Sequence, residues 1–519
     1  MMRNHCWIIL MAGLLTSCAV KIKPIDFDRN AFVENHHIDE IIKNQAPVEG
    51  PISLYDAMAR ALKYNLDQKI EYAQQEYREK QVALDRIGMF PNAIINIART
   101  SRNNDSGSSS RSLITGEQSL QTSTSSERQT NTGDLSVSWD ILDFGFAYIQ
   151  SKQDLDEQMI AEERRRKVTT RILEDVRTAY WRAVSADRTH RKLAKLEALA
   201  QKSLYQAEQL ENRRQVSPIK VLNFQRDLLR IQSNVQRMQR ELILAKNQLA
   251  ALMNMRPNTR FSLQLPDRTD IVPELPGSAE QMILLGLKYR PELRESTYRE
   301  RINREEINKQ LVASLPSVKA ILGLNYDSNN YLYNNQWVTG SAQISWNLMN
   351  VFRYPRQKAV LKAEGKVIKA QEHALSMAIM TQVYIARARF IRLSHELNTI
   401  RRGYDVQERI LQLTEAGYQV KQISQQELIR ERMNSILEEV RYDTAYADLQ
   451  NAYANLYASM GIDSFSLKIT PKTKLSNISR ALKQYWTEDM LVLPNMKPPK
   501  IIETDEYHDH NQTGQEEDN

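Results

Sequence analysis

The chain has 519 residues, too many for one compact domain and enough for roughly three. Hydrophobic residues make up 41% and charged residues 26%, a balance that long, exposed helices would give. After the first twenty residues no apolar run reaches the length of about eighteen that a membrane-spanning helix needs. This excludes a helical membrane protein, and the low glycine and proline content excludes a collagen.

Cysteine usage and charge exclude two further classes. Cys6 and Cys18 are the only cysteines and both lie near the N-terminus, which excludes a disulfide framework or a cysteine metal site in the mature chain. The net charge is +7 although residues 503–519 carry seven acids and no Lys or Arg. Bases and acids alternate along helical stretches such as 294–304, which is typical of solvated helix faces. We therefore expect no nucleic-acid partner.

The N-terminus has the pattern of an export signal. Arg3 precedes a short apolar core over residues 7–15, and residues 15–18 read Leu-Thr-Ser-Cys. This resembles the lipobox of bacterial lipoproteins, which predicts a signal peptide over residues 1–17 and an acyl chain on Cys18. Ala19 differs from the aspartate of inner-membrane retention signals, so the resemblance implies delivery to the outer membrane. The alternative is an ordinary signal peptide with an incidental cysteine.

The rest of the chain is duplicated. Residues 61–65 recur as 286–290, at an offset of 225, and residues 138–143 recur as 345–350, at an offset of 207. The second offset persists, because Val216 and Ser217 align with Ile423 and Ser424. Two copies of one plan determine the architecture that we expect.

Each copy contains two stretches with the alternation of β-strands. They cover residues 93–97 and 135–141 in the first copy, and 318–324 and 342–348 in the second, joined by polar loops. Such strands suit a membrane barrel or, alternatively, a half-buried soluble sandwich. Four strands cannot close a barrel, since about eight is the smallest example, so membrane insertion would require an oligomer in which each subunit supplies a four-stranded sector.

Helices of unusual length fill the remainder. Residues 146–214 and 351–419 would each form a helix of roughly 100 Å. Residues 218–252 keep a heptad seam, which predicts a coiled coil. The corresponding seam of the second copy is interrupted by Asp443 and Gln450, so we expect it to be partly hydrated. The expected fold class is mainly α with a β-barrel sector.

The sequence resembles the TolC-like outer-membrane factor family. The resemblance covers nearly all of the mature chain and rests on the duplicated plan, on residues 138–145, on residues 178–181 and on residues 415–420 before the second interhelical turn. It implies a homotrimer with a twelve-stranded barrel above a long periplasmic α-barrel. It also implies a passive exit duct of a tripartite efflux or type I secretion system, working with a periplasmic adaptor and an inner-membrane transporter.

The resemblance places two candidate sites. The interhelical turns, with Val216, Ser217, Ile423 and Ser424, correspond to the periplasmic tips where the family meets its adaptor. The two serines also suit helix N-caps, which is the alternative interpretation.

The second candidate site is the periplasmic entrance. Tyr418 matches a tyrosine of the family's latch and Glu427 its first acid, whereas Ile423 stands where an arginine is expected and Arg430 where a second acid is expected. An ordinary surface ion pair between Glu427 and Arg430 is the alternative.

No sequence pattern points to catalysis. HExxH and GxSxG are absent, and the pair of histidines in 508–510 is a weak metal candidate in a polar terminus, so we expect no enzyme, metal or cofactor other than the lipid. The competing function is a coiled-coil lipoprotein acting as scaffold or adhesin. The expected organisation is a signal peptide (1–17), an anchor and equatorial segment (18–51), the first repeat (52–255), a linker (256–278), the second repeat (279–463), and an equatorial segment with an acidic disordered tail (464–519).

Overall fold

A computed structural model of the chain describes residues 40–41, 45–119, 121–212, 217–256, 259–266, 268, 273–275, 277–462, 469 and 473–487. The predicted signal peptide, Cys18, Val216 and the acidic residues 503–519 lie outside this part of the chain. Within it, none of the helices combines the length and the apolar character needed to cross a membrane.

The two repeats have the same helices in the same order and of the same lengths, which are 11, 22, 72 and 35 residues. The first repeat consists of α3 (Leu54–Tyr64), α4 (Leu66–Ile87), β1 (Asn92–Ser101), β4 (Gln129–Asp140), α5 (Ile141–Asn212) and α6 (Pro218–Leu252). The second consists of α7 (Ala279–Tyr289), α8 (Pro291–Val312), β5 (Ser317–Asp327), β6 (Gln336–Ser345), α9 (Leu348–Gln419) and α10 (Gln425–Ser459). The predicted duplication is therefore confirmed.

Local sequence explains where the short helices begin and end. Ser53 and Ser278 each form a capping box with the residue three positions on, so α3 and α7 start at equivalent places. Asn65 ends α3 and caps α4, because its side chain accepts hydrogen bonds from the N–H groups of Asp67 and Gln68. In the second repeat Pro291 opens α8 instead, where a missing N–H costs nothing.

The four long strands form one antiparallel sheet in the order β1-β4-β5-β6. Two details of the sequence prediction were wrong. β4 begins at Gln129, inside the stretch predicted as a loop, and that loop also holds a small hairpin of β2 (Gly107–Ser108) and β3 (Ser123–Thr124). β6 ends at Ser345, so Trp346 and Leu348 lie beyond the strand.

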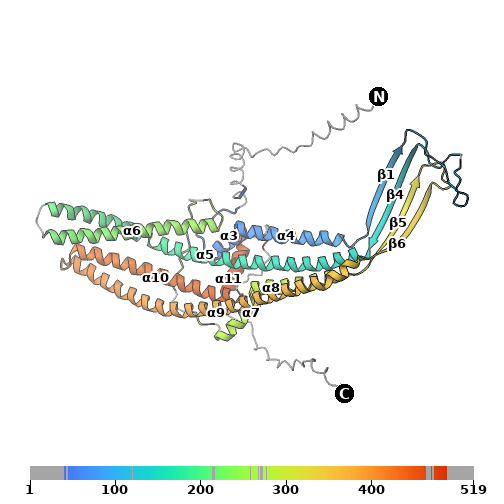
Figure 1. The fold of residues 1–519 in the computed structure, drawn as a ribbon. Helices are drawn as coiled ribbons and strands as arrows, with labels where there is room; N and C mark the ends of the chain where they lie inside the picture. Colours follow the sequence, from blue (N-terminus) through green and yellow to red (C-terminus); the bar gives the residue numbers. More distant parts are fainter. Residues whose placement is uncertain are drawn as a thin grey trace, which may run out of the picture.

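The sheet stands at one end of an elongated molecule, and the paired helices α5/α6 and α9/α10 reach the opposite end (Figure 1). Next to the sheet, α4 packs on α5, α5 on α8, and α8 on α9. The helices therefore follow the same order as the strands that they continue. Each 72-residue helix is about 108 Å long, so it passes both a short partner near the sheet and a coiled-coil partner further away.

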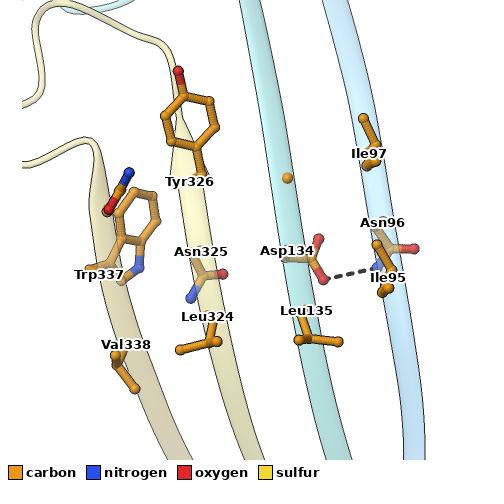
Figure 2. Close-up of a pocket in the computed structure, with 12 residues that line it drawn as sticks. Ile95, Asn96, Ile97, Asp134, Leu135, Leu324, Asn325, Tyr326, Trp337 and Val338 are labelled. Carbon is orange, nitrogen blue, oxygen red and sulfur yellow. Dashed lines mark hydrogen bonds between the residues drawn. The ribbon is translucent and has the colours of Figure 1, made fainter.

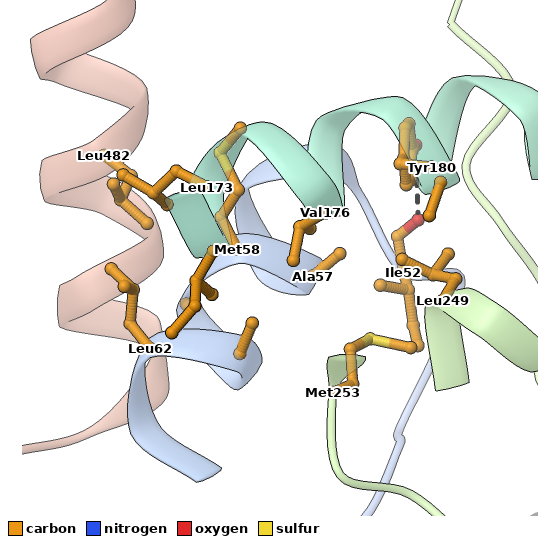
Figure 3. Close-up of a cluster of buried hydrophobic side chains, with 14 of the residues drawn as sticks. Ile52, Ala57, Met58, Leu62, Leu173, Val176, Tyr180, Leu249, Met253 and Leu482 are labelled. Carbon is orange, nitrogen blue, oxygen red and sulfur yellow. Dashed lines mark hydrogen bonds between the residues drawn. The ribbon is translucent and has the colours of Figure 1, made fainter. Parts of the chain in front are cut away.

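A central apolar cluster packs α3 and the C-terminal end of α6 against α5. Met58 and Leu62 of α3 pack against Leu173 of α5 and Leu482 of α11 (Leu475–Thr487), as Figure 3 shows. An isolated parallel bridge between Ile52 and Leu263 joins the linker to the residue just before α3 and its cap. Burying such side chains contributes about 1.5–3 kcal/mol each, so this cluster fixes α3, α11 and the linker at one height on α5.

The predicted seam of α6 is confirmed. Val221, Leu228, Val235 and Leu249 are buried, and the central part of the seam shares an apolar cluster with α5 and α10. The expectation of a hydrated seam on α10 was wrong at Asp443, which is buried and paired with arginine.

Candidate functional site

The sheet has one apolar and one polar face. Strand register aligns Ile95, Leu135, Leu324 and Val338 in one row, and places Val137 beside Leu322 in the next. These side chains are exposed, with Ile95 at 70% and Val338 at 66% of their full accessible surface. Contiguous exposed apolar surface of this kind marks an interaction with lipid or protein.

The opposite face carries polar side chains joined across strands. Asn96 donates to the Asp134 carboxylate over 3.0 Å, and Asn325 donates to the Thr339 hydroxyl over 3.0 Å. Figure 2 shows the first of these bonds in a shallow concavity lined by all four strands. The sheet can thus separate an apolar environment from an aqueous one.

Both edges of the sheet are open. Among the residues that the structure describes, β1 and β6 each pair on one side only, and all residues of both strands are exposed. The adjoining helices α4 and α9 are likewise at the edges of their layer. Unpaired backbone groups on a long strand are a template for another strand.

The loops of the two repeats are clamped together above the sheet. The Asn329 amide donates to the carbonyl of Ser125 over 2.8 Å, and its side-chain oxygen accepts from the N–H of Glu127 over 3.2 Å. Asn329 is buried, although sequence reasoning had treated its segment only as an exposed polar loop.

At the opposite end, the second interhelical turn is fully described. Ser424 caps α10 by accepting the Glu427 N–H over 3.2 Å. Lys421 adopts φ of +60°, the left-handed conformation that a glycine usually supplies. A Cβ on Gly417 would lie 2.6 Å from a methyl carbon of Ile423, so this glycine permits the close approach that folds the turn.

In the first turn, Ser217 precedes α6 but makes no side-chain capping bond. The predicted capping role therefore applies to Ser424 and not to Ser217.

The residues predicted for the entrance lie close to the second turn. Glu427 and Arg430 form an ion pair of 3.5 Å on half-exposed side chains, and Tyr418 is 39% exposed. Arg430 also lies 3.5 Å from Glu431, a contact that sequence reasoning missed.

A second missed group is an ion-pair cluster further up the coil. Asp443 of α10 accepts bonds from Arg188 of α5 and from Arg268 of the linker, at 2.5 and 2.6 Å. The Arg268 guanidinium lies over the ring of Tyr442, 4.6 Å from its centroid. The only sequence signal was an acid interrupting a heptad.

A carboxyl pair lies between α4 and α5, nearer the sheet. Burial raises the pKa of Asp154 to about 6, and the facing carboxyl of Asp85 adds to the rise. Gln150 and Arg78 act in the opposite direction. Among the described residues, no group of three or more His, Cys, Asp or Glu side chains could hold a metal ion.

The sequence matches no family model and no curated protein sequence. Solved structures are similar along most of the chain. The CmeC outer-membrane channel of Campylobacter jejuni has a TM-score of 0.62 and 13% identity, covering 82% of this chain and 89% of that one. The open state of the MtrE outer-membrane channel of Neisseria gonorrhoeae gives 0.58 and 16%, covering 82% and 95%.

The outer-membrane channel OprN gives a TM-score of 0.60 at 16% identity, covering 79% of this chain and 89% of that one. At these identities the similarity establishes the fold alone. The long helices, the four-stranded sheet and these similarities together give the chain the fold of the TolC-like outer-membrane channels.

Proposed function

We propose that the chain is the outer-membrane component of a tripartite efflux or type I secretion system, a passive exit duct. The single observation that carries this proposal is the sheet with two open edges, one apolar face and one polar face. A conduit needs such a sheet to close with copies of itself, because unpaired edges are not tolerated in lipid.

Three copies would pool twelve strands, with β6 of one subunit pairing with β1 of the next. The helical layer has a matching edge. Along α9, Ala359, Ala363, Ala370 and Ala374 are exposed. Small side chains of this kind allow a neighbouring helix to approach closely. The apolar sheet face would then contact outer-membrane lipid, and the polar face would line the duct.

The far end of the tube would meet the other components. We assign Val216, Ser217, Ile423 and Ser424 to the tips that contact a periplasmic adaptor, which in turn engages an inner-membrane transporter. Tyr418, Glu427 and Arg430 would line the entrance. Opposite charges one helical turn apart partly neutralise each other, so this ring attracts cations less than two acidic rings would.

The entrance assignment can be tested by conductance in planar bilayers. Replacing both Glu427 and Arg430 with alanine is expected to raise single-channel conductance. The matched control is Glu438 and Arg441, a pair with the same spacing further along α10. Equal conductance in both double variants would leave Glu427 and Arg430 as ordinary surface charges.

The anchor is assigned to Cys18, whose acylation would hold the N-terminus at the outer membrane. Cys18→Ser is expected to abolish metabolic labelling with radioactive palmitate. Label retained in the variant would contradict a lipoprotein.

The duct itself is tested by the native mass of the detergent-purified protein, with negative-stain images of the same sample. Three copies forming a hollow particle longer than about 100 Å are expected. A monomer or a solid rod would overturn the duct and support the scaffold or adhesin instead.

A further inference from the structure

The upper part of α9 carries a stripe of lysines. Lys362, Lys366 and Lys369 recur at helical spacing, all three are exposed, and none makes an ion pair within the described part of the chain. Residues 353–369 hold six bases and one acid. The equivalent segment of the first repeat, residues 146–162, holds one base and four acids. The charge has thus been reversed between two segments that share one backbone plan.

The stripe lies on the side of the helices that continues the apolar face of the sheet. Trp139 stands in the apolar row beside Ala320, and its ring contacts Phe144, which stacks on Tyr148. These three aromatic rings follow one side of the first repeat from β4 into α5. At the offset of 207, Phe144 corresponds to Val351, and Lys362 lies on the same side of α9, three turns further from the sheet.

Two carboxylates of α5, in the same helical layer, are paired with bases of α8. Asp156 of α5 pairs with Arg301 of α8, and Glu163 pairs with Arg294 of α8 at 2.9 Å. These contacts hold α5 to α8, and within the described part of the chain no carboxylate forms an ion pair with the lysine stripe of α9. Unopposed positive charges at this spacing favour binding of an acidic segment.

The chain itself contains such a segment. Residues 503–519 carry seven acids and no Lys or Arg. The last described residue, Thr487, follows Trp486, whose ring packs against the cluster that contains Ile379 and Val383 of α9. Measured along α9 from Ile379 towards the sheet, His373 lies about 9 Å away and Lys362 about 26 Å away. The sixteen residues from Thr487 to Glu503 can span up to about 50 Å, so the acids can reach every lysine of the stripe.

We propose that the acidic C-terminal segment, residues 503–519, binds the lysine stripe of α9 formed by Lys362, Lys366 and Lys369. The contact fastens the chain after α11 to the wall of the tube near the sheet and covers this exposed basic face of α9. It does not depend on what the duct transports.

The first test compares the full chain with one that ends at residue 502, which keeps every described residue. Both are treated with a water-soluble acylating reagent, and modification of each lysine is measured by mass spectrometry. Truncation is expected to raise modification of Lys362, Lys366 and Lys369 at least threefold and to leave the exposed control residues Lys195 and Lys202 unchanged. Equal modification of the three lysines in both chains overturns the proposal. Equally low modification would mean that another polyanion or lipid, and not residues 503–519, protects the stripe.

The second test changes the lysine stripe and measures how accessible the acidic segment becomes. A glutamate-specific protease is expected to remove residues after Glu503 several times faster in Lys362→Glu/Lys366→Glu/Lys369→Glu than in the unaltered chain. The matched control, Arg191→Glu/Lys195→Glu/Lys202→Glu on α5, should leave the rate unchanged. Salt at about 1 M should accelerate cleavage of the unaltered chain to the same rate, because the Debye length falls to about 3 Å. A rate that responds to neither the stripe variant nor salt overturns the contact.

Discussion

The two long helices have the same length and the same place in their repeats, yet they lie in different surroundings. α5 packs against α4 and α8 near the sheet and against α6 and α10 further away, so it is enclosed on both sides. α9 packs against α8, α7 and α10, and its remaining side is open. The two repeats therefore share the same order and length of helices, whereas their side chains differ according to where each helix lies in the layer.

The coiled-coil partners show the same divergence. α10 packs along both α9 and α5, whereas α6 packs along α5 and shares an apolar cluster with α10. Glu439 and Asp443 of α10 are buried and paired with bases. At the offset of 207, α6 has Gln232 and Gln236. The second repeat thus holds an ion-pair cluster where the first has neutral amides, because α10 packs along two long helices and receives Arg188 of α5 and Arg268 of the linker.

Of the variants considered, removal of the Asp443 carboxylate should lower the free energy of unfolding most. Asp443→Ala leaves the guanidinium groups of Arg188 and Arg268 without the carboxylate that they share. Deleting one partner of a buried ion pair costs about 3–5 kcal/mol of unfolding free energy. Urea unfolding followed by helical circular dichroism measures the loss.

The control for that variant is Glu438→Ala, one turn away, whose partner Arg441 is mostly exposed. It should change the unfolding free energy by less than about 1 kcal/mol. Equal losses in the two variants would mean that the cluster does not hold α10 to α5.

The carboxyl pair next to the sheet predicts a pH dependence specific to the first repeat. Asp154 has a pKa raised to about 6, and at the offset of 207 the second repeat has Leu361. At pH values between the unfolded-state pKa and the raised folded-state pKa, the folded chain holds a proton on Asp154 that the unfolded chain has released. Stability from this group is therefore present below about pH 4 and is lost as the pH rises to about 6.

Asp154→Leu, which copies the second repeat, should remove this loss. Relative to the unaltered chain, it is expected to gain on the order of 1–2 kcal/mol between pH 4.5 and 7, measured as the shift in unfolding midpoint. The control is Glu157→Leu, one turn along the same helix, with a carboxylate that faces Arg78. A pH profile unchanged by Asp154→Leu would contradict a raised pKa of Asp154.

The sequence predicted the elements set by periodicity and local signals. The heptad seam of α6, the strand alternation and the second interhelical turn appear at or near their expected positions, because each depends on neighbours within a few residues. Contacts between repeats could not be predicted. The pairing of Asp443 with Arg188 and of Asn329 with Ser125 joins residues far apart in the chain, and nothing local shows that a heptad interruption or a loop asparagine will be buried.

The smallest expected effect concerns the two interhelical turns, which differ in whether a serine caps the following helix. The Ser424 hydroxyl accepts the Glu427 N–H, whereas Ser217 makes no such bond, although both serines precede a 35-residue helix. Pro218 follows Ser217 and has no N–H, so the first turn of α6 has one fewer donor to satisfy. Ser424→Ala should therefore cost about 1 kcal/mol, and Ser217→Ala close to nothing, in thermal unfolding of the purified protein. Equal costs would mean that the first turn is capped in solution as well, and that the difference between the repeats does not extend to their tips.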